Sequence, residues 1–125
     1  MPKSVLVVDD DVTVRQMLCC ILALEADFAV CGEAENGRDA IEKAKGLRPE
    51  VILMDLSMPV MNGIEATRAL KMLMPTVPVI ILSDYTDVFS EEEALSAGIT
   101  GLVSKSEHMS VLIDRVRALL HPSAG

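Results

Sequence analysis

Residues 4–11 read SVLVVDDD, an almost unbroken apolar run that ends in three consecutive carboxylates. The four apolar residues 5–8 have the length and the β-branched composition of a buried strand. Asp9, Asp10 and Asp11 therefore follow directly on the end of a buried element. Adjacent acids repel one another unless a positive group lies among them. The stretch thus predicts a first strand whose end faces a cation.

The same pattern of a short apolar run followed by an amphipathic helix occurs five times along the chain. The apolar runs span residues 5–8, 28–32, 51–54, 77–82 and 99–104. Ser90 and Glu93 predict a capping box at the start of the fourth helix, and Pro75 and Gly98 predict the ends of the third and fourth helices. Strand–helix alternation of this kind predicts an α/β fold, a parallel sheet with crossover helices on both faces.

Composition narrows the classes of protein that this chain can belong to. Half of the 125 residues are hydrophobic, which is enough for one domain with a single core. The net charge of −8 disfavours direct binding of nucleic acid or of an anionic membrane surface. No apolar run is long enough to cross a membrane, and the three cysteines are expected to be reduced thiols of a cytoplasmic protein. We expect a domain at 1–120 and a flexible tail, or the start of a linker to an output domain, at 121–125.

Polar residues follow four of the five predicted strands, and ligands of an open parallel sheet bind at the carboxyl ends of its strands. These residues are Asp9 and Asp10 after the first strand, Asp55 after the third, Ser83 and Asp84 after the fourth, and Lys105 after the fifth. Asp11 is expected to cap the first helix, with no metal role. Mg²⁺ prefers carboxylate oxygens, and a carboxylate beside a metal and a lysine can attack phosphorus. The strand ends therefore predict a Mg²⁺-dependent phosphoryl-transfer site.

Four stretches carry a resemblance to a known family: VLVVDDD at 5–11, VILMDLSMPVMNGIEA at 51–66, VIILSD at 79–84 and AGITGLVSK at 97–105. Together they resemble the receiver domain of bacterial two-component response regulators, most of all receivers that precede a helix-turn-helix transcription-factor domain. The resemblance covers essentially the whole chain. It implies the flavodoxin-like (βα)5 fold, a doubly wound sheet of five parallel strands in the order 2-1-3-4-5.

The resemblance also implies the roles of the acidic residues. Asp55 would be the phosphoacceptor and would also bind Mg²⁺. Asp10 would be a direct Mg²⁺ ligand, Asp9 would act on the metal through water, and the backbone carbonyl of Ser57 would complete the protein ligands. The implied function is that of a signalling domain which phosphorylates and dephosphorylates itself rather than that of a multiple-turnover enzyme.

Further implications concern the phosphoryl group and the partners. Ser83 and Lys105 would bind the phosphoryl group, and Lys105 would form an ion pair with Asp55 in the resting state. A sensor histidine kinase would donate the phosphoryl group. Rearrangement of the Ser83 and Lys105 loops would switch a surface formed by the fourth helix, fifth strand and fifth helix, through which two copies of the chain could dimerise.

Four residues depart from the family pattern or modulate it. Leu102 stands where many receivers place an aromatic switch residue, and Ser106 follows Lys105 where the family often has proline, so we expect a trans bond there. Asp84 stands where a small residue is usual, and its charge is expected to slow phosphorylation. Tyr85 is expected to shield the aspartyl phosphate from water.

Two other classes of protein stay open at this point. A Mg²⁺-dependent phosphohydrolase with an aspartate nucleophile would carry a second acid at an Asp-x-Asp motif, whereas residues 55–57 read Asp-Leu-Ser. A pseudo-receiver would keep the fold as an interaction module that does not depend on phosphorylation. Retention of Asp10, Asp55, Ser83 and Lys105 argues against the pseudo-receiver, and Leu102 and Asp84 argue for it. Taken singly, each acid is also an ordinary helix-start or loop residue.

Overall fold

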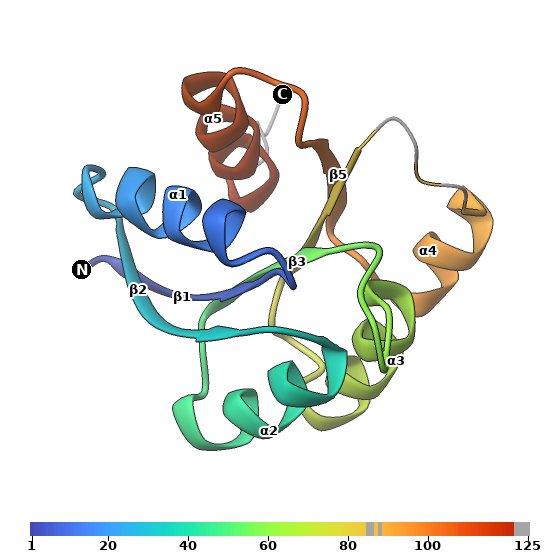
Figure 1. Ribbon diagram of the computed structural model, residues 1–125. Coiled ribbons are helices and arrows are strands. Elements are labelled where there is room, and N and C mark those ends of the chain that lie inside the picture. The colour runs from blue at the N-terminus through green and yellow to red at the C-terminus, as the bar shows by residue number, and fades with distance from the viewer. Residues whose placement is uncertain (85–86, 88, 122–125) are drawn as a thin grey trace.

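The computed structural model describes residues 1–84, 87 and 89–121 of the chain (Figure 1). The elements in chain order are β1 (Lys3–Val8), α1 (Val12–Ala23), β2 (Phe28–Ala34), α2 (Gly37–Leu47), β3 (Val51–Asp55), α3 (Gly63–Leu73), β4 (Val79–Ser83), α4 (Glu91–Ala97), β5 (Gly101–Ser104) and α5 (Met109–Leu120). The predicted role of Tyr85, and residues 122–125 of the tail predicted at 121–125, fall outside the described residues. The five strand–helix units are confirmed.

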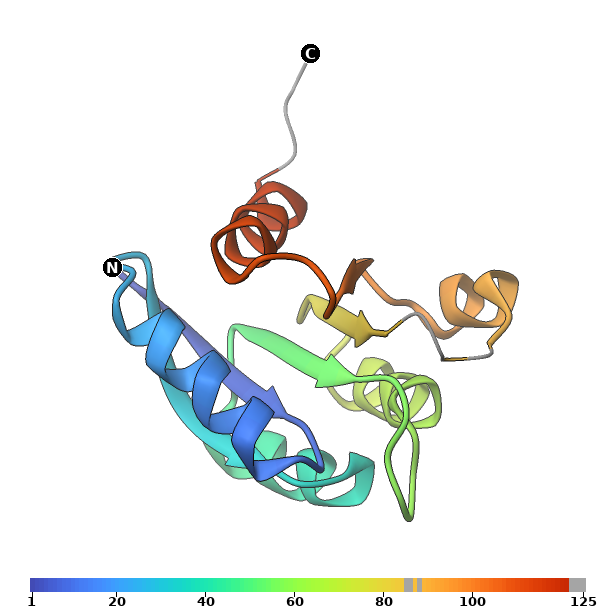
Figure 2. The same cartoon turned by 45° about the horizontal axis from the view of Figure 1, so that its top comes forward.

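The sheet has five strands in the order β2-β1-β3-β4-β5, and every pair of neighbours is parallel. Both the parallel α/β architecture and the strand order are as predicted. The arrowheads of β1, β3 and β4 in Figure 2 point the same way, and since every pair of neighbouring strands is parallel, the carboxyl ends of all five strands share one edge of the sheet. In this order β1 and β3 are adjacent at the centre, which brings the segments after residues 8 and 55 side by side.

Helices cover both faces of the sheet: α1 and α5 lie on one face, and α2, α3 and α4 lie on the other (Figure 1). Alternate strand residues divide between the two layers, since successive side chains of a strand point to opposite faces. Val5 and Val7 of β1 pack with α1 and α5, whereas Leu6 and Val8 pack with α2 and α3. The core is aliphatic, in keeping with the scarcity of aromatic residues.

Local hydrogen bonds set the helix ends. The Asp11 carboxylate accepts the amides of Thr13 and Val14, so Asp11 caps α1 as predicted. Gly98 ends α4 in the left-handed region at φ 99°, which a residue without a Cβ adopts at no steric cost. Helix α3 ends at Leu73, two residues before Pro75.

The complete capping box of the described chain belongs to α3 rather than to α4. Asn62 accepts the amide of Glu65 at 2.9 Å, and the Glu65 carboxylate accepts the amide of Asn62 at 3.1 Å. Ser90 accepts the amide of Glu93 at 3.2 Å, which is one half of the box predicted there. The loop between β3 and α3 is therefore held at its helix end by two reciprocal bonds, which fixes the segment that follows Asp55.

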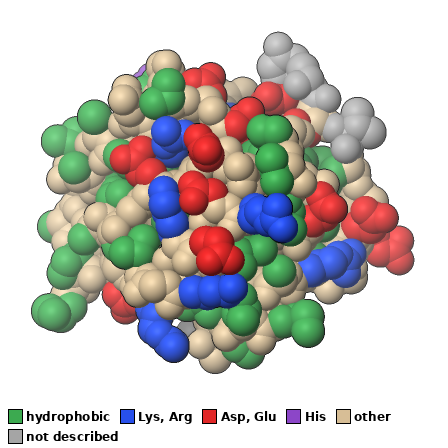
Figure 3. Space-filling view, turned by 60° about the horizontal axis from the view of Figure 1, so that its bottom comes forward, with side chains coloured by type: hydrophobic (Ala, Val, Ile, Leu, Met, Phe, Trp, Pro, Cys, Tyr) green, Lys and Arg blue, Asp and Glu red, His purple; other side chains and the backbone are tan. Residues whose placement is uncertain are grey.

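Three further observations concern membrane-spanning helices, the peptide bond after Lys105 and the surface over α2 and α3. No helix in the described part of the chain is both long and apolar enough to span a membrane. The described residues contain no cis peptide bond, so the bond between Lys105 and Ser106 is trans, as expected for a non-proline residue. On the face that carries α2 and α3, acidic and basic side chains are interspersed with exposed hydrophobic ones (Figure 3).

Candidate functional site

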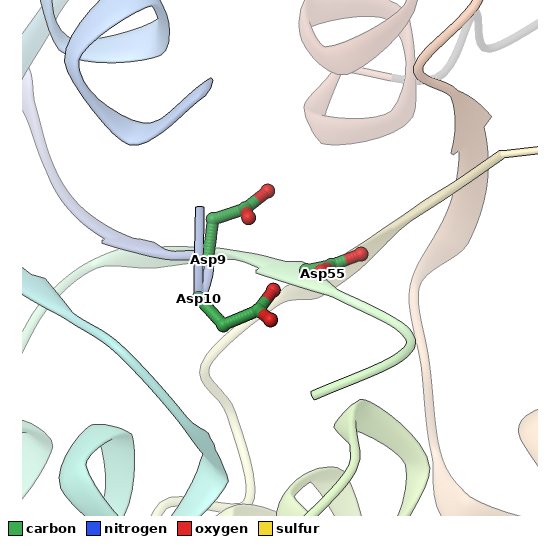
Figure 4. A group of neighbouring side chains, drawn as sticks. All are labelled: Asp9, Asp10 and Asp55. Atoms are coloured by element: carbon green, nitrogen blue, oxygen red, sulfur yellow. The ribbon is translucent and has the colours of Figure 1, made fainter. Parts of the chain in front are cut away.

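Three carboxylates gather where β1 and β3 end. Asp9 and Asp10 follow β1 and Asp55 is the last residue of β3, and Figure 4 shows the three side chains extending in the same general direction. One carboxylate oxygen from each lies within 4.8 Å of the others. Asp9 and Asp55 are buried and Asp10 is exposed. Negative charge is thus concentrated at the central strands of the sheet, partly shielded from water.

Strand alternation explains why these residues meet. Odd-numbered residues of β1 and β3, such as Val7 and Leu53, pack in the layer of α1 and α5, and so does Val103 of β5. Residues two positions further along a strand point to the same face. Asp9, Asp55 and Lys105 stand two positions after those three residues. One face of the sheet therefore delivers two acids and one lysine from three separate strands.

Lys105 forms ion pairs with both buried acids. Its Nζ lies 2.9 Å from Oδ1 of Asp55 and 3.0 Å from Oδ2 of Asp9. The ion pair between Lys105 and Asp55 that the family resemblance implies is therefore present. Burial lowers the pKa of Lys105, but the hydrogen bonds and charges of the two acids outweigh burial and hold this pKa above its ordinary value. Lys105 is consequently a fixed ammonium at neutral pH.

The carboxyl of Asp55 is held in an unfavourable environment. Burial raises its pKa, the hydrogen bond from Lys105 opposes that effect, and the charge of Asp9 raises the pKa again, to a value of about 6. Each contribution has a plain origin, because desolvation and a neighbouring negative charge both disfavour the ionised form. Asp55 thus carries a carboxylate that a bound cation would stabilise.

Hydrogen bonds hold both the side chain and the backbone carbonyl of Asp9. Its Oδ1 accepts the backbone amide of Asp11 at 2.9 Å, and its backbone carbonyl accepts Nη1 of Arg15 at 2.7 Å. Arg15 in turn pairs with Glu33 at 3.0 Å. These contacts orient the Asp9 side chain toward Lys105 before any ligand arrives, and sequence analysis did not single out Arg15.

The three acids and Lys105 line one cavity. Its described lining residues are Asp9, Asp10, Asp11, Val14, Asp55, Ser57, Asp84, Asp87, Lys105 and Ser106. Ser57 and Asp84 thus stand in the same cavity as the predicted phosphoacceptor. Among these described lining residues there are six carboxylates and one ammonium, so the site is strongly negative.

Ser83 and Leu102 are not among the described lining residues of this cavity. Val79 and Ile81 of β4 pack in the layer of α2, α3 and α4, and Ser83 follows them at the same two-residue spacing. Leu102 packs against that layer too. Both residues therefore stand on the face of the sheet opposite Asp9, Asp55 and Lys105, although Ser83 ends a strand beside them.

Asp87 is a site residue that sequence analysis missed. Its Oδ1 accepts the hydroxyl of Ser57 at 2.7 Å, and its Oδ2 accepts the backbone amide of Asp84 at 2.9 Å. The carboxylate therefore joins the loop after β3 to the loop after β4. No strand end or periodic pattern marks residue 87 in the sequence, because the contact spans 30 residues and exists only in the fold.

The raised pKa of Asp55 predicts a specific pH dependence of stability. The folded state holds the Asp55 proton more tightly than the unfolded chain does, so this contribution to stability is complete below the unfolded pKa, which lies near 3.8, and is lost as pH rises through about 6. In chelator, the free energy of unfolding should fall by about 1 kcal/mol between pH 5 and pH 7.5 because of this group.

Urea denaturation of the wild type and of Asp55→Asn at the two pH values isolates that contribution. The difference in free energy of unfolding between the wild type and Asp55→Asn should change by about 1 kcal/mol between the two pH values, because all other titrating groups are common to both proteins. A difference that stays constant with pH, or that grows more favourable to the wild type as pH rises, contradicts the assignment of a raised pKa to Asp55.

Comparison with known proteins identifies the family. The family model described as the response regulator receiver domain matches residues 5–117. The chain therefore belongs to the response regulator receiver family, whose members are receiver domains of two-component systems. This confirms the family and the fold that the sequence resemblance implied.

Individual relatives agree with that assignment. The chain is 38% identical to the response regulator protein VraR of Staphylococcus saprophyticus over 94% of its own length and 56% of the relative. It is also 38% identical to the chemotaxis protein CheY of Thermotoga maritima, covering 91% of the chain and 94% of that protein. The chain spans between a third and somewhat more than half of the first three curated relatives that it matches.

Solved structures share the fold. A two-component response regulator of the LuxR family from Aurantimonas superposes with a TM-score of 0.88 at 27% identity, over 96% of this chain and 86% of that one. The response regulator domain of Thermotoga maritima CheB superposes with a TM-score of 0.83 at 34% identity, over 96% of this chain and 95% of that one. One is described as a response regulator of the LuxR family and the other as the response regulator domain of CheB, and a shared fold does not by itself specify an output.

Proposed function

We propose that this receiver domain accepts a phosphoryl group on Asp55 from a histidine kinase, in a Mg²⁺-dependent reaction, and that it then switches a protein-interaction surface. The observation that carries the proposal is the environment of Asp55. Its carboxylate lies 2.9 Å from a lysine ammonium and beside two further acids at the carboxyl edge of a parallel sheet. Such an arrangement suits a nucleophile toward phosphorus that works with a divalent cation.

The chemistry follows from the groups present. An oxygen of the Asp55 carboxylate attacks the phosphorus atom of the donor, and the bond between phosphorus and the donor's nitrogen or oxygen breaks with its electron pair leaving on the donor. The product is an acyl phosphate on Asp55. Lys105, already within 3.0 Å of Asp9 and of Asp55, offsets the charge of the added phosphoryl oxygens. Asp55 undergoes the reaction itself, so the domain differs from a multiple-turnover enzyme.

The donor set suits Mg²⁺. The hard oxygens of Asp10 and Asp55, and the backbone carbonyl of Ser57, are the proposed direct ligands, and Asp9 is the proposed ligand through water. Asp10 is exposed and Asp9 is buried against Lys105, which supports this division of roles. Mg²⁺ binds through few carboxylates and keeps positions for substrate oxygens, so when bound it would neutralise charge on the transferring phosphoryl group.

Ser83 is the proposed second phosphoryl-binding group, and the structure suggests how it would transmit the signal. Its side chain belongs to the face of the sheet that packs with α3 and α4, whereas Asp55 belongs to the other face. Bonding of the Ser83 hydroxyl to a phosphoryl oxygen therefore requires movement of the end of β4. That movement would bias the surface of α4, β5 and α5 between two states. Leu102, on the same face, has no ring to swing inward, so its part in the switch would be through packing.

The whole protein's output belongs to the proposal as well. Two relatives, LnrK and DegU, are named transcriptional regulatory proteins, and the chain covers about half of the length of each. We assign residues 1–120 to the receiver and residues 121–125 to a tail or to the start of a linker to an output domain. The switched surface carries mixed charges, such as Glu91, Asp114 and Arg115, that could pair across a homodimer. The net charge of −8 supports a protein partner rather than direct contact of this domain with nucleic acid, and the three cysteines support a cytoplasmic location.

Intact mass measurement after incubation with acetyl phosphate and Mg²⁺ tests the proposal. The wild type should gain the mass of one phosphoryl group, and the gain should disappear in chelator. No gain from folded protein across a range of Mg²⁺ concentrations would support the alternative, a pseudo-receiver that acts as an interaction module without phosphorylation. Continuous release of product from a small phosphoester would support a phosphohydrolase instead.

Replacement of Asp84 by alanine is expected to speed phosphorylation by acetyl phosphate. Asp84 lines the cavity that contains Asp55 and adds a negative charge on the path of an anionic donor. A unit charge about 4 Å away contributes roughly fivefold in rate in water, and more where water is excluded. The rate of mass gain, compared with that of Asp84→Asn as an isosteric neutral control, measures the effect. An unchanged or slower rate in both variants refutes an electrostatic role for Asp84.

A further inference from the structure

Asp87 holds two loops together at the edge of the acidic cavity. The Ser57 hydroxyl donates to Oδ1 of Asp87 at 2.7 Å, and the Asp84 amide donates to Oδ2 at 2.9 Å. Ser57 lies in the loop after β3, two residues beyond Asp55, and Asp84 directly follows β4. Hydrogen bonds to an ionised acceptor are stronger than bonds between neutral groups. One carboxylate therefore connects the loop that carries the proposed phosphoacceptor site to the loop that follows Ser83.

Asp87 is half-buried in an electrostatically unfavourable place, because other acids surround it. It stands in a cavity whose other described lining residues include five carboxylates and one ammonium. Both Lys105 contacts go to Asp9 and Asp55, so Asp87 is compensated by the Ser57 and Asp84 donors. Two hydrogen-bond donors hold the Asp87 carboxylate in place although the neighbouring carboxylates repel it. Any negative charge added to the cavity would therefore weaken this arrangement.

We propose that Asp87 is a positioning residue for phosphoryl transfer: it clasps the Ser57 hydroxyl and the Asp84 amide, and thereby holds the β3–α3 and β4–α4 loops together until Asp55 is phosphorylated. This inference rests on the proposed function. The clasp restrains Ser57, the proposed source of a metal-binding carbonyl, and places a negative charge where the donor enters. It therefore slows phosphorylation of the resting domain.

Phosphorylation itself opens the clasp. Conversion of the Asp55 carboxylate to an acyl phosphate adds negative charge to the cavity that Asp87 lines. Repulsion then disfavours the clasped arrangement, and the Ser57 hydroxyl and the Asp84 amide are released when Ser83 moves to bond the phosphoryl group. Loss of the clasp thus couples chemistry at Asp55 to the segment that leads into α4.

Four variants test the clasp. Asp87→Ala removes the charge and both acceptors, whereas Asp87→Asn removes the charge and retains one acceptor oxygen. Ser57→Ala removes the hydroxyl donor, and a double variant combines Ser57→Ala with Asp87→Ala. Glu92→Ala is the matched control, because Glu92 is an exposed acid of α4 outside the described cavity lining and its loss changes the net charge equally.

Two readouts separate the clasp from the proposed function. Hydrogen exchange of the Asp84 amide in unphosphorylated protein should rise about three- to tenfold in Asp87→Ala, as expected for loss of one hydrogen bond, and should not change in Glu92→Ala. The initial rate of mass gain from acetyl phosphate should rise about fivefold in Asp87→Ala and also in Asp87→Asn. The double variant should match Asp87→Ala in both measurements, since Ser57 acts on the loop through Asp87.

The alternative outcomes are distinct. Unchanged exchange in Asp87→Ala, an unchanged phosphorylation rate, or full additivity with Ser57→Ala overturns the clasp while the wild type still gains its phosphoryl group. A wild type that gains no phosphoryl group overturns the proposed function and the positioning role together. If Asp87→Ala does not fold, the phosphorylation rate of Asp87→Asn and the exchange of the Asp84 amide in Ser57→Ala test the clasp instead. An unchanged value in both measurements overturns it.

Discussion

Replacement of Asp55 by asparagine is expected to abolish the gain of a phosphoryl group from acetyl phosphate and Mg²⁺. The amide is uncharged, and its oxygen cannot form an acyl phosphate without loss of the amide nitrogen, so no slower version of the same reaction is available to the variant. The substitution preserves shape in a side chain that is buried beside Lys105. Folding should therefore survive, and intact mass measured under wild-type conditions reports the chemistry alone.

Asp11→Asn is the matched control for that experiment. Asp11 lines the same cavity, but its carboxylate is engaged in capping α1, and asparagine caps a helix about as well as aspartate. The control should gain one phosphoryl group as the wild type does. Retention of the mass gain by Asp55→Asn would show that another carboxylate accepts the phosphoryl group, and Asp10, the exposed acid of the same group of three, would be the next residue to replace.

Replacement of Gly63 by alanine is expected to lower the free energy of unfolding by about 1–3 kcal/mol, the usual range for overpacking a buried site. A Cβ at Gly63 would stand 2.5 Å from the backbone oxygen of Asp55 and 3.2 Å from the Cα of Leu56. Backbone atoms cannot rotate away as a flexible side chain can. The Gly63 amide also donates to the Leu56 carbonyl at 2.8 Å, which ties the start of α3 to the end of β3.

The same substitution should slow phosphorylation, because relief of the clash displaces the peptide that carries Asp55. Gly46→Ala is the control: Gly46 lies inside α2, and no heavy atom stands within 4 Å of a Cβ built there. Alanine in a helix should stabilise the protein by about 0.5–1 kcal/mol relative to glycine. Urea denaturation of both variants gives the comparison. Equal changes in the free energy of unfolding of Gly63→Ala and Gly46→Ala would refute the close approach of α3 to Asp55.

Sequence patterns predicted the elements well where burial follows a simple period. The apolar runs at 28–32 and 51–54 mark β2 and β3, which extend to Ala34 and Asp55. The runs at 77–82 and 99–104 begin too early, because β4 starts at Val79 and β5 at Gly101. Val77 and Ile99 are buried, yet they lie outside the strands. Hydrophobicity reports burial, whereas pairing with a neighbouring strand decides where a strand begins.

The candidate site was predictable to a similar extent. Asp9, Asp55 and Lys105 follow strand ends, and parallel strands bring such ends to one edge, so their meeting could be anticipated. Strand order and the individual roles came from the family resemblance. Two features could not be anticipated. That Ser83 lies on the opposite face of the sheet from Asp55 depends on the exact end of β4, and the contact of Asp87 with Ser57 depends on the course of a loop.

The sequence by itself therefore determined the properties that arise between residues close together in the chain: which segments are strands and helices, which residues end them, and which acids follow a buried run. Only the tertiary structure set the distances at which Lys105 pairs with both Asp9 and Asp55, across 96 and 50 positions of the chain, and only it placed Asp87 against Ser57. The physical reason is range. Periodicity and capping are settled within a few residues, whereas charge compensation in a cavity depends on distances that only the packed sheet sets.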